Sequence, residues 1–264
     1  MYREPRSENT ESRSLLEWSV LAIPPPLIVF DHDAMPRIRG HLAVLPEGPE
    51  AWALLNKTLF GSNETGGHSV AVQSEVLPWD WSSVFGRTAP LHLEIGFNRG
   101  RFLRAMAAKH PERDFVGIEI RRRFCWRLAH ILNAEDTERR NIRIIWADAK
   151  NISPVLFEAG SLEGIYVTFP DPWWKKRHVK RRLVDTAFAA SMASLLGPGG
   201  RVWVKSDVPA IAEEIAQSLI ADARFGEPIP FAADELPFTH REVNCVAAGL
   251  PIERFSVTRR ADPV

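Results

Sequence analysis

The chain has 264 residues, 45% of them hydrophobic and 25% charged, which fits a folded globular protein and excludes disordered, fibrous and membrane-embedded classes. Its 33 basic and 33 acidic side chains cancel, so the overall charge alone indicates no polyanionic partner. Cys125 and Cys245 form neither a disulfide framework nor a metal-ligand spacing, so we expect a reducing, cytoplasmic compartment and no metal. The polar first residues and the lack of an apolar run of about 18 residues predict neither a signal peptide nor a membrane span.

Residues 1–80 are predicted to form a less regular N-terminal extension, packed on a main domain of residues 81–264. Residues 1–14 are nearly all polar, which favours disorder. The three prolines 24–26 must be extended, because each proline moves its predecessor out of the helical region. Short strands over 27–30 and 69–76 and a short helix over 50–59 are weak predictions, and no functional motif stands out here.

From Leu91 onward the hydrophobic pattern becomes regular. Strands are predicted over 91–95, 115–120, 142–147, 165–169, 201–205 and 255–259, and helices over 101–109, 121–136, 183–196 and 211–221. Strands that alternate with helices indicate an α/β protein with a doubly wound, Rossmann-like parallel sheet. In such a sheet the ligand binds in a crevice at the carboxyl ends of the strands.

Positive charge is concentrated in the middle of the chain. Residues 91–220 carry 21 basic and 15 acidic side chains, whereas residues 1–90 carry 7 and 11. Six of the eight residues 175–182 are Lys or Arg, and they directly follow Trp173 and Trp174. Such a cluster is typical of a nucleic-acid surface, because cations neutralise phosphates and aromatic rings stack on bases. Plainer explanations stay open: a solvated helix start for the charges, and packing against the domain for the rings.

Four acidic residues stand at or near the ends of the first four regular strands: Glu94, Glu119, Asp148 and Asp171. These ends line one crevice in a doubly wound sheet, so we expect the carboxylates to converge on one ligand. Glu119 can accept both hydroxyls of a ribose, Asp148 an adenine amine, and Glu94 a ligand amino group. Glu119 can also be a solvated helix start and Asp148 a plain N-cap. Glu94 is harder to explain without a partner, because burying it alone costs roughly several kcal/mol.

The turn after the first regular strand separates two classes of cofactor. A dinucleotide fingerprint needs glycine at its second position, but Gly96-Phe97-Asn98-Arg99-Gly100 has Asn98 there. Glu94, just before the turn, would also repel a pyrophosphate. S-adenosylmethionine has no phosphate and carries an ammonium and a sulfonium, which suit carboxylates. The turn therefore favours S-adenosylmethionine over NAD.

With these residues assembled, the stretch from Trp81 to Ala221 resembles the tRNA (guanine-N7)-methyltransferase family. The matching motifs stand in the order that the family requires: Leu93-Glu94-Ile95-Gly96-Phe97, Gly117-Ile118-Glu119, Asp148-Ala149, Phe169-Pro170-Asp171-Pro172-Trp173, the basic residues 175–182, Gly199-Gly200 and Ser206-Asp207. Each is weak alone, except the Phe-Pro-Asp-Pro-Trp block with its basic tail, which is specific.

The resemblance implies a class I methyltransferase fold and methyl transfer from S-adenosylmethionine to guanine N7 in the variable loop of tRNA. It implies a cofactor site formed by Glu94, Gly96, Glu119, Asp148, Ala149 and Asp171, with Asp171 also the catalytic residue that positions the base. The implied contacts to tRNA are Lys175, Arg177, His178, Lys180, Arg181, Arg182 and Asp207, together with Thr239 and Glu242 of a Thr-x-x-Glu motif. A monomer is expected.

The chain departs from the family pattern in three places. Asn98 replaces a second turn glycine, Trp174 replaces a common proline, and residues 243–251 replace a tail that contains Gly-His. Alternatives therefore stay open: an RNA-binding protein that has lost methyl transfer, or a methyltransferase with another RNA substrate. A methyltransferase for a protein or small molecule is a further alternative, and a nicotinamide-dependent dehydrogenase fits least.

Overall fold

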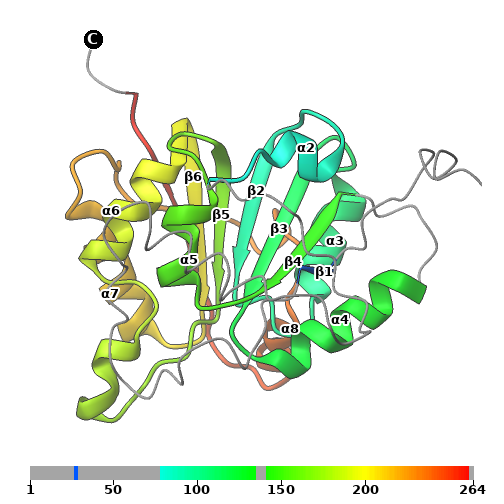
Figure 1. Ribbon diagram of the computed structural model, residues 1–264. Coiled ribbons are helices and arrows are strands. Elements are labelled where there is room, and N and C mark those ends of the chain that lie inside the picture. Colours follow the sequence, from blue (N-terminus) through cyan, green and yellow to red (C-terminus); the bar gives the residue numbers. More distant parts are fainter. Residues whose placement is uncertain (1–26, 29–77, 135–140, 262–264) are drawn as a thin grey trace, which may run out of the picture.

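The computed structural model describes residues 27–28, 78–134 and 141–261, whose strands form one eight-stranded sheet between two layers of helices (Figure 1). The strands are β1 (Leu27–Ile28), β2 (Leu91–Ile95), β3 (Asp114–Glu119), β4 (Ile142–Trp146), β5 (Leu162–Thr168), β6 (Leu196–Ser206), β7 (Ile229–Pro230) and β8 (Glu253–Thr258). The helices are α2 (Trp81–Phe85), α3 (Arg101–Lys109), α4 (Arg122–Ala134), α5 (Ala149–Leu156), α6 (Thr186–Leu195), α7 (Pro209–Ile220) and α8 (His240–Ala247), with a 3₁₀ helix η1 (Lys176–Arg181).

The strand order is β1-β4-β3-β2-β5-β6-β8-β7. Neighbouring strands from β1 to β6 pair in parallel, and β8 lies antiparallel to both β6 and β7. The chain builds the sheet outward from β2 to β4, then crosses over to continue from β5. The order therefore reverses between β2 and β5, and in an open α/β sheet this switch point is where a ligand crevice forms. The predicted doubly wound fold is confirmed.

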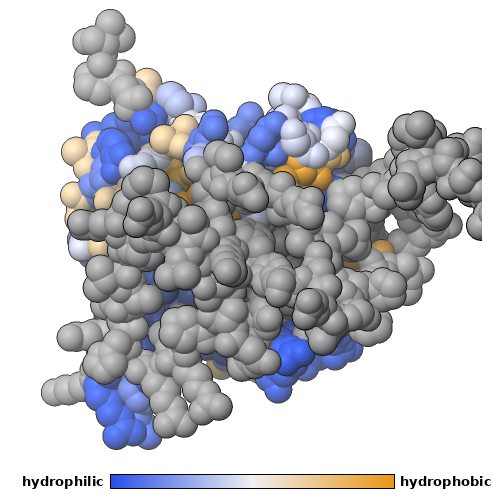
Figure 2. Space-filling model, viewed as in Figure 1, coloured by the Kyte–Doolittle hydropathy of each residue, from blue (hydrophilic) through white to orange (hydrophobic). Residues whose placement is uncertain are grey.

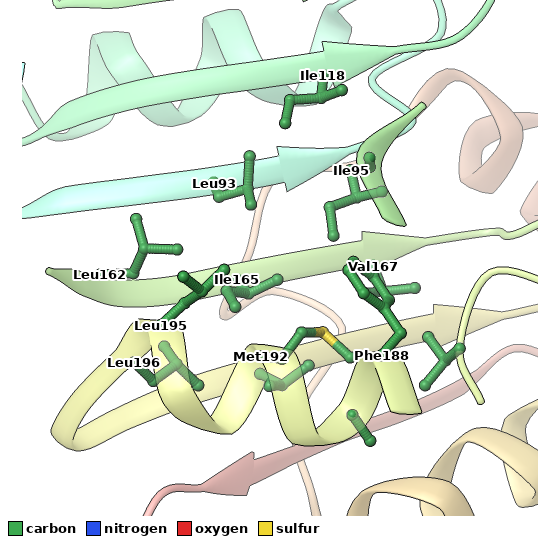
Figure 3. Close-up of a cluster of buried hydrophobic side chains, with 14 of the residues drawn as sticks. Leu93, Ile95, Ile118, Leu162, Ile165, Val167, Phe188, Met192, Leu195 and Leu196 are labelled. Carbon is green, nitrogen blue, oxygen red and sulfur yellow. The ribbon is translucent and has the colours of Figure 1, made fainter. Parts of the chain in front are cut away.

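Side chains of the central strands alternate between two buried cores. On one face Leu93, Ile165 and Val167 pack against Phe188 and Met192 of α6 (Figure 3). The core on the opposite face is richer in aromatic residues, and Phe97, Phe102, Phe115 and Tyr166 pack there with side chains of α3 and α4. Because both faces are covered by helices, the inner strands are nearly continuous hydrophobic runs, as expected for a parallel sheet. Glu94 of β2 points to this second, aromatic face of the sheet.

Most predicted elements occur within one or two residues of their predicted bounds, and three differences have physical causes. Helix α5 was not predicted, because it has only eight residues and contains Pro154, which is unfavourable inside a helix. Strand β6 begins five residues before the predicted start, because pairing of Leu196 with Leu162 carries the strand through the glycine-rich segment 197–200. Helix α8 was also not predicted, although its capping box is visible in the sequence.

The predictions for the N-terminal extension are largely untested. Of the strand predicted over 27–30, Leu27–Ile28 is described, and it pairs in parallel with β4. The predicted disorder over 1–14, helix over 50–59 and strand over 69–76 lie outside the described residues. Trp79 is only 1% exposed and belongs to the core, so residues before the predicted boundary at residue 80 contribute both to the core and, through β1, to the sheet. None of the described helices has the length and hydrophobicity needed to cross a bilayer.

Candidate active site

The predicted acids lie at one end of the sheet, on or just after four adjacent strands. In the order β4, β3, β2, β5, the strands carry Asp148, Glu119, Glu94 and Asp171 at their carboxyl ends, the lower edge of the sheet in Figure 1. Glu94 and Glu119 repel each other, and so do Glu119 and Asp171. The fold therefore places these acids around the switch point between β2 and β5.

Glu94 is the most perturbed acid of this end of the sheet. Glu94 is 1% exposed, and among the described residues its Oε2 atom has no hydrogen-bond partner. Burial, with added repulsion from Glu119, raises its pKa from 4.5 to about 8, although the Thr168 hydroxyl and Lys205 oppose this. A buried carboxyl with an unpartnered oxygen is costly, and a cationic ligand group would remove that cost.

Glu119 joins the two loops that flank the crevice. It accepts the backbone N–H of Asn98 at 2.9 Å on Oε2 and that of Arg121 at 2.8 Å on Oε1. Burial raises its pKa, while these two bonds act in the opposite direction. Each carboxylate oxygen can accept more than one hydrogen bond, so acceptor capacity remains for a ligand hydroxyl. Glu119 thus both shapes the crevice and faces it.

The turn between β2 and α3 has three residues with positive φ: Gly96 at 76°, Asn98 at 51° and Gly100 at 70°. The Gly96 N–H donates to the carbonyl of Ile118 at 2.7 Å, which holds the turn against β3. At Gly100 a Cβ would also lie 2.5 Å from Leu128, so the position requires glycine for space as well. Asn tolerates the left-handed region better than other L-residues, so Asn98 adopts the conformation that a turn glycine supplies.

Asp148 is the N-cap of α5. Its Oδ1 accepts the N–H of Lys150 at 2.9 Å, and Ala149 behind it is buried. The capping role that the sequence left open is therefore present. It occupies one carboxylate oxygen, so within the described part of the chain Oδ2 remains able to accept from a ligand.

Asp171 stands in a loop that reverses direction sharply after β5. Phe169 and Trp173, on either side of it, both have positive φ, at 51° and 44°. The Phe169 N–H donates to the Lys205 carbonyl at 2.7 Å, which fixes the start of the loop on β6. The half-exposed Asp171 carboxylate accepts from Arg121 Nη2 at 2.7 Å. This ion pair crosses from the loop after β5 to the start of α4.

The basic stretch continues from this loop into η1. Figure 2 shows a group of hydrophilic residues at the lower left, where Figure 1 has the yellow-green turn of η1. Lys175 and Arg177 are exposed, and the Arg181 guanidinium lies 5.2 Å from the ring centre of Trp173. Arg182 instead points inward and donates to the Pro172 carbonyl and to Glu214. The stretch thus divides into exposed cations and one that anchors the loop.

His178 and Lys180 complete the predicted tRNA contacts in η1. His178 accepts from Arg177 Nε at 3.2 Å and packs edge-on against Trp173 at 5.6 Å. Partial desolvation and the neighbouring cations lower the pKa of His178, which favours its neutral form. The side chain of Lys180 lies outside the described residues.

The structure places Thr239 and Glu242 in the capping box that begins α8. Thr239 Oγ1 accepts the Glu242 N–H at 2.9 Å, and both residues are buried. The Glu242 carboxylate also binds the ammonium of Lys205 at 2.8 Å and Arg254 Nη2 at 2.9 Å. Both of its oxygens are engaged, so this buried ion network ties α8 to β6 and β8.

Asp207, predicted at the end of β6, is mostly buried and pairs with the exposed Arg241 of α8. Its Oδ2 accepts from Arg241 Nε at 3.0 Å, with Cys245 Sγ at 3.7 Å. A second contact reaches α8 from the turn between β2 and α3, because Arg99 Nη1 lies 2.9 Å from His240 Nε2. Helix α8 is thus held at the rim of the crevice by contacts from both sides.

A cavity of about 240 Å³ lies at the other end of the sheet, lined by Trp81, Arg87, Leu91 and Asp114 among others. Leu91 and Asp114 begin β2 and β3, so this cavity is a whole strand length away from the four acids. Asp114 in this cavity is already paired with Arg87 at 2.6 Å, so we locate the candidate site by the four carboxylates at the carboxyl ends of the strands. In the described part of the chain no group of three or more His, Cys, Asp or Glu residues could hold a metal ion.

Comparison with known proteins supplies the family. A sequence profile described as "Putative methyltransferase" matches residues 88–235. The tRNA (guanine-N(7)-)-methyltransferase of Synechococcus sp. (strain JA-3-3Ab) is 38% identical over 71% of this chain and 80% of that protein. The tRNA (guanine-N(7)-)-methyltransferase of Anaeromyxobacter dehalogenans (strain 2CP-C) is 40% identical over 70% of this chain and 93% of that protein. The chain belongs to the tRNA (guanine-N7)-methyltransferase family.

Among solved structures, the 16S rRNA methyltransferase KamB superposes with a TM-score of 0.50. It covers 69% of this chain and 93% of that protein at 15% identity, a level that supports the shared fold alone. The resemblance predicted from the motifs is therefore confirmed at the level of family and fold.

Three residues of this tRNA (guanine-N7)-methyltransferase family member bear on the site and were not predicted from its sequence. Thr168 and Lys205 act on Glu94 from β5 and β6, and Arg121 pairs with Asp171. Arg121 stands two residues after Glu119 in the sequence, at the start of a run of three arginines. No local pattern distinguishes it from Arg122 and Arg123. Its role follows from the tertiary structure, because the carboxyl ends of β3 and β5 lie at the same edge of the sheet and bring Arg121 to Asp171.

Proposed function

We propose that this chain transfers a methyl group from S-adenosylmethionine to N7 of a guanosine in tRNA. The observation that carries the proposal is the buried Glu94 carboxyl, whose Oε2 has no partner among the described residues and which lies at the switch point of the sheet. The family of the chain supplies the reaction. The ligand class that best satisfies such a group is a cation without a phosphate. The cofactor of methyl transfer has that chemistry.

In this proposal each acid has its own part of the cofactor. Glu94 would accept the ammonium of the methionine end, which favours the charged carboxylate and removes the cost of its burial. Glu119 would accept the ribose hydroxyls, with Gly96 letting the backbone approach the ligand. Asp148 and Ala149 would border the adenine. S-adenosylmethionine supplies an electrophilic methyl carbon on its sulfonium.

Asp171 acts in the proposal as a positioning residue for the guanine. The N7 lone pair lies outside the aromatic system, so no general base is needed and catalysis rests on orientation. The Asp171 carboxylate is half-exposed at the crevice and is already directed by Arg121. It can accept from the N1–H and amino edge of a guanine, which places N7 on the opposite edge, free to be methylated.

The tRNA contacts follow from the exposed cations next to this loop. Lys175, Arg177 and Arg181 would neutralise phosphates, with His178 and Lys180 on the same short helix. Arg182 would contribute by holding the loop in place. Asp207, Thr239 and Glu242 would form the α8 side of the substrate rim, and their buried contacts fix its position. We further propose that the protein is a monomer and is located in the cytoplasm, where tRNA is available and two buried free thiols are stable.

The test is transfer of labelled methyl from S-adenosylmethionine to bulk tRNA, followed by nucleoside analysis. We expect 7-methylguanosine with the wild-type chain and a loss on the order of 100-fold in kcat/KM with Asp171→Asn. Asp234→Asn, which changes an exposed acid elsewhere, is the matched control and should leave the rate unchanged. No labelled nucleoside, or a label on another atom or in protein, would refute the proposal.

A further inference from the structure

Trp173 and Trp174 are adjacent in the loop that carries Asp171, but their surroundings differ. Trp173 is partly buried, with Arg181 5.2 Å from its ring centre and the His178 ring 5.6 Å away. Trp174 is 70% exposed and, among the described residues, has no ring, cation or hydrogen-bond partner. A ring already covered by a cation is a poor platform for a base, whereas the face of Trp174 is open.

The surroundings of Trp174 carry positive charge. Exposed Lys175 follows it directly, and exposed Arg177 and Arg181 lie in the same short helix. The nearest acid in the loop, Asp171, is already paired with Arg121. An open aromatic ring among cations fits a single-stranded nucleic acid better than an apolar protein surface, since the cations bind the backbone and the ring stacks on a base.

We propose that Trp174 is the stacking platform for one unpaired base of the RNA substrate. The proposal rests on the proposed function for the identity of that RNA as tRNA. It assigns the stacking role to Trp174 alone, with Trp173 holding η1 through Arg181 and His178. The contact holds one base beside the cations of η1 without selecting its identity, because every base has a face on which an indole can stack.

The first test compares the tRNA affinities of four full-length proteins: wild type, Trp174→Ala, Trp174→Phe and Ile229→Ala. Loss of stacking predicts roughly 5- to 100-fold weaker binding for Trp174→Ala. Trp174→Phe keeps an aromatic face and should stay within about threefold. Ile229→Ala removes another exposed apolar side chain, at β7, and should bind like the wild type. The salt dependence should be the same in all four, because no phosphate contact is removed.

The second test identifies the base. tRNAs assembled by ligation carry one abasic nucleotide at successive positions of the variable loop. For the wild type, one abasic position should weaken binding as much as Trp174→Ala does, and the Ala variant should be insensitive to that same position. A structural role of Trp174 would instead weaken binding to every RNA equally. Binding unchanged in Trp174→Ala, an equal loss for all abasic RNAs, or a reduced salt dependence would each overturn the proposal.

Methyl transfer to the same RNAs separates this inference from the proposed function. If the wild type forms 7-methylguanosine while Trp174→Ala binds normally, the proposed function stands and the stacking role fails. If no 7-methylguanosine forms but one abasic position and Trp174→Ala show matched losses, the stacking role stands and the proposed function fails.

Discussion

Glu94→Gln should make the protein without cofactor more stable at alkaline pH. The substitution keeps the size of the side chain but cannot ionise. Burial raises the pKa of Glu94 from 4.5 to about 8, a difference of roughly 3.5 pH units. Each pH unit corresponds to about 1.4 kcal/mol, so the buried carboxylate costs the folded state about 5 kcal/mol once it is fully charged.

The sign of the pH dependence follows from where the proton is bound. Between pH 4.5 and 8 the unfolded chain has lost this proton while the folded chain keeps it, so the contribution of Glu94 to stability falls as pH rises. The glutamine variant has no such term. The free energy of unfolding of Glu94→Gln minus that of the wild type should therefore be near zero at pH 4.5 and grow by about 1.4 kcal/mol per pH unit up to pH 8.

The assay is urea unfolding of both proteins at pH 5, 6, 7, 8 and 9, with Glu163→Gln as control. Glu163 is an exposed acid in β5, and its replacement should give a small difference that does not change with pH. S-adenosylhomocysteine should reverse the order, because its ammonium favours the charged carboxylate that only the wild type has. A pH-independent difference between Glu94→Gln and wild type, or a less stable variant at pH 9, would refute the reasoning.

Three further outcomes are expected. Glu242→Gln should lower the free energy of unfolding by about 3–5 kcal/mol, because Lys205 and Arg254 lose their buried counter-charge; a change below 1 kcal/mol would contradict this role. Asn98→Gly should stay within about 1 kcal/mol of wild type in urea unfolding, whereas Asn98→Val should lose about 2 kcal/mol at its positive φ, and equal values would argue against the left-handed turn. Arg181→Ala should reduce the slope of log affinity for tRNA against log salt by about one, and an unchanged slope would show that no phosphate is bound there.

The sequence by itself determined the parts of this protein that depend on local pattern. Continuous apolar runs alternating with amphipathic helices were enough to predict the doubly wound sheet, because strands buried on both faces are apolar throughout and the helices that cover them are apolar on one side. The acids Glu94, Glu119 and Asp171 could be selected from the sequence, since a strand end is recognisable from the residues that follow it. The Phe-Pro-Asp-Pro-Trp block and its basic tail then indicated the family.

Tertiary structure decided which of these groups carry charge, contact one another or remain open. The raised pKa of Glu94 depends on its burial among β3, β5 and β6, and the Arg121–Asp171 pair joins residues 50 positions apart. The buried network around Glu242 brings α8 onto β6 and β8, which no short-range pattern encodes. The same holds for the two tryptophans, because solvent exposure is a property of everything packed nearby: Trp173 and Trp174 read alike in the sequence, and only the fold covers one and leaves the other open.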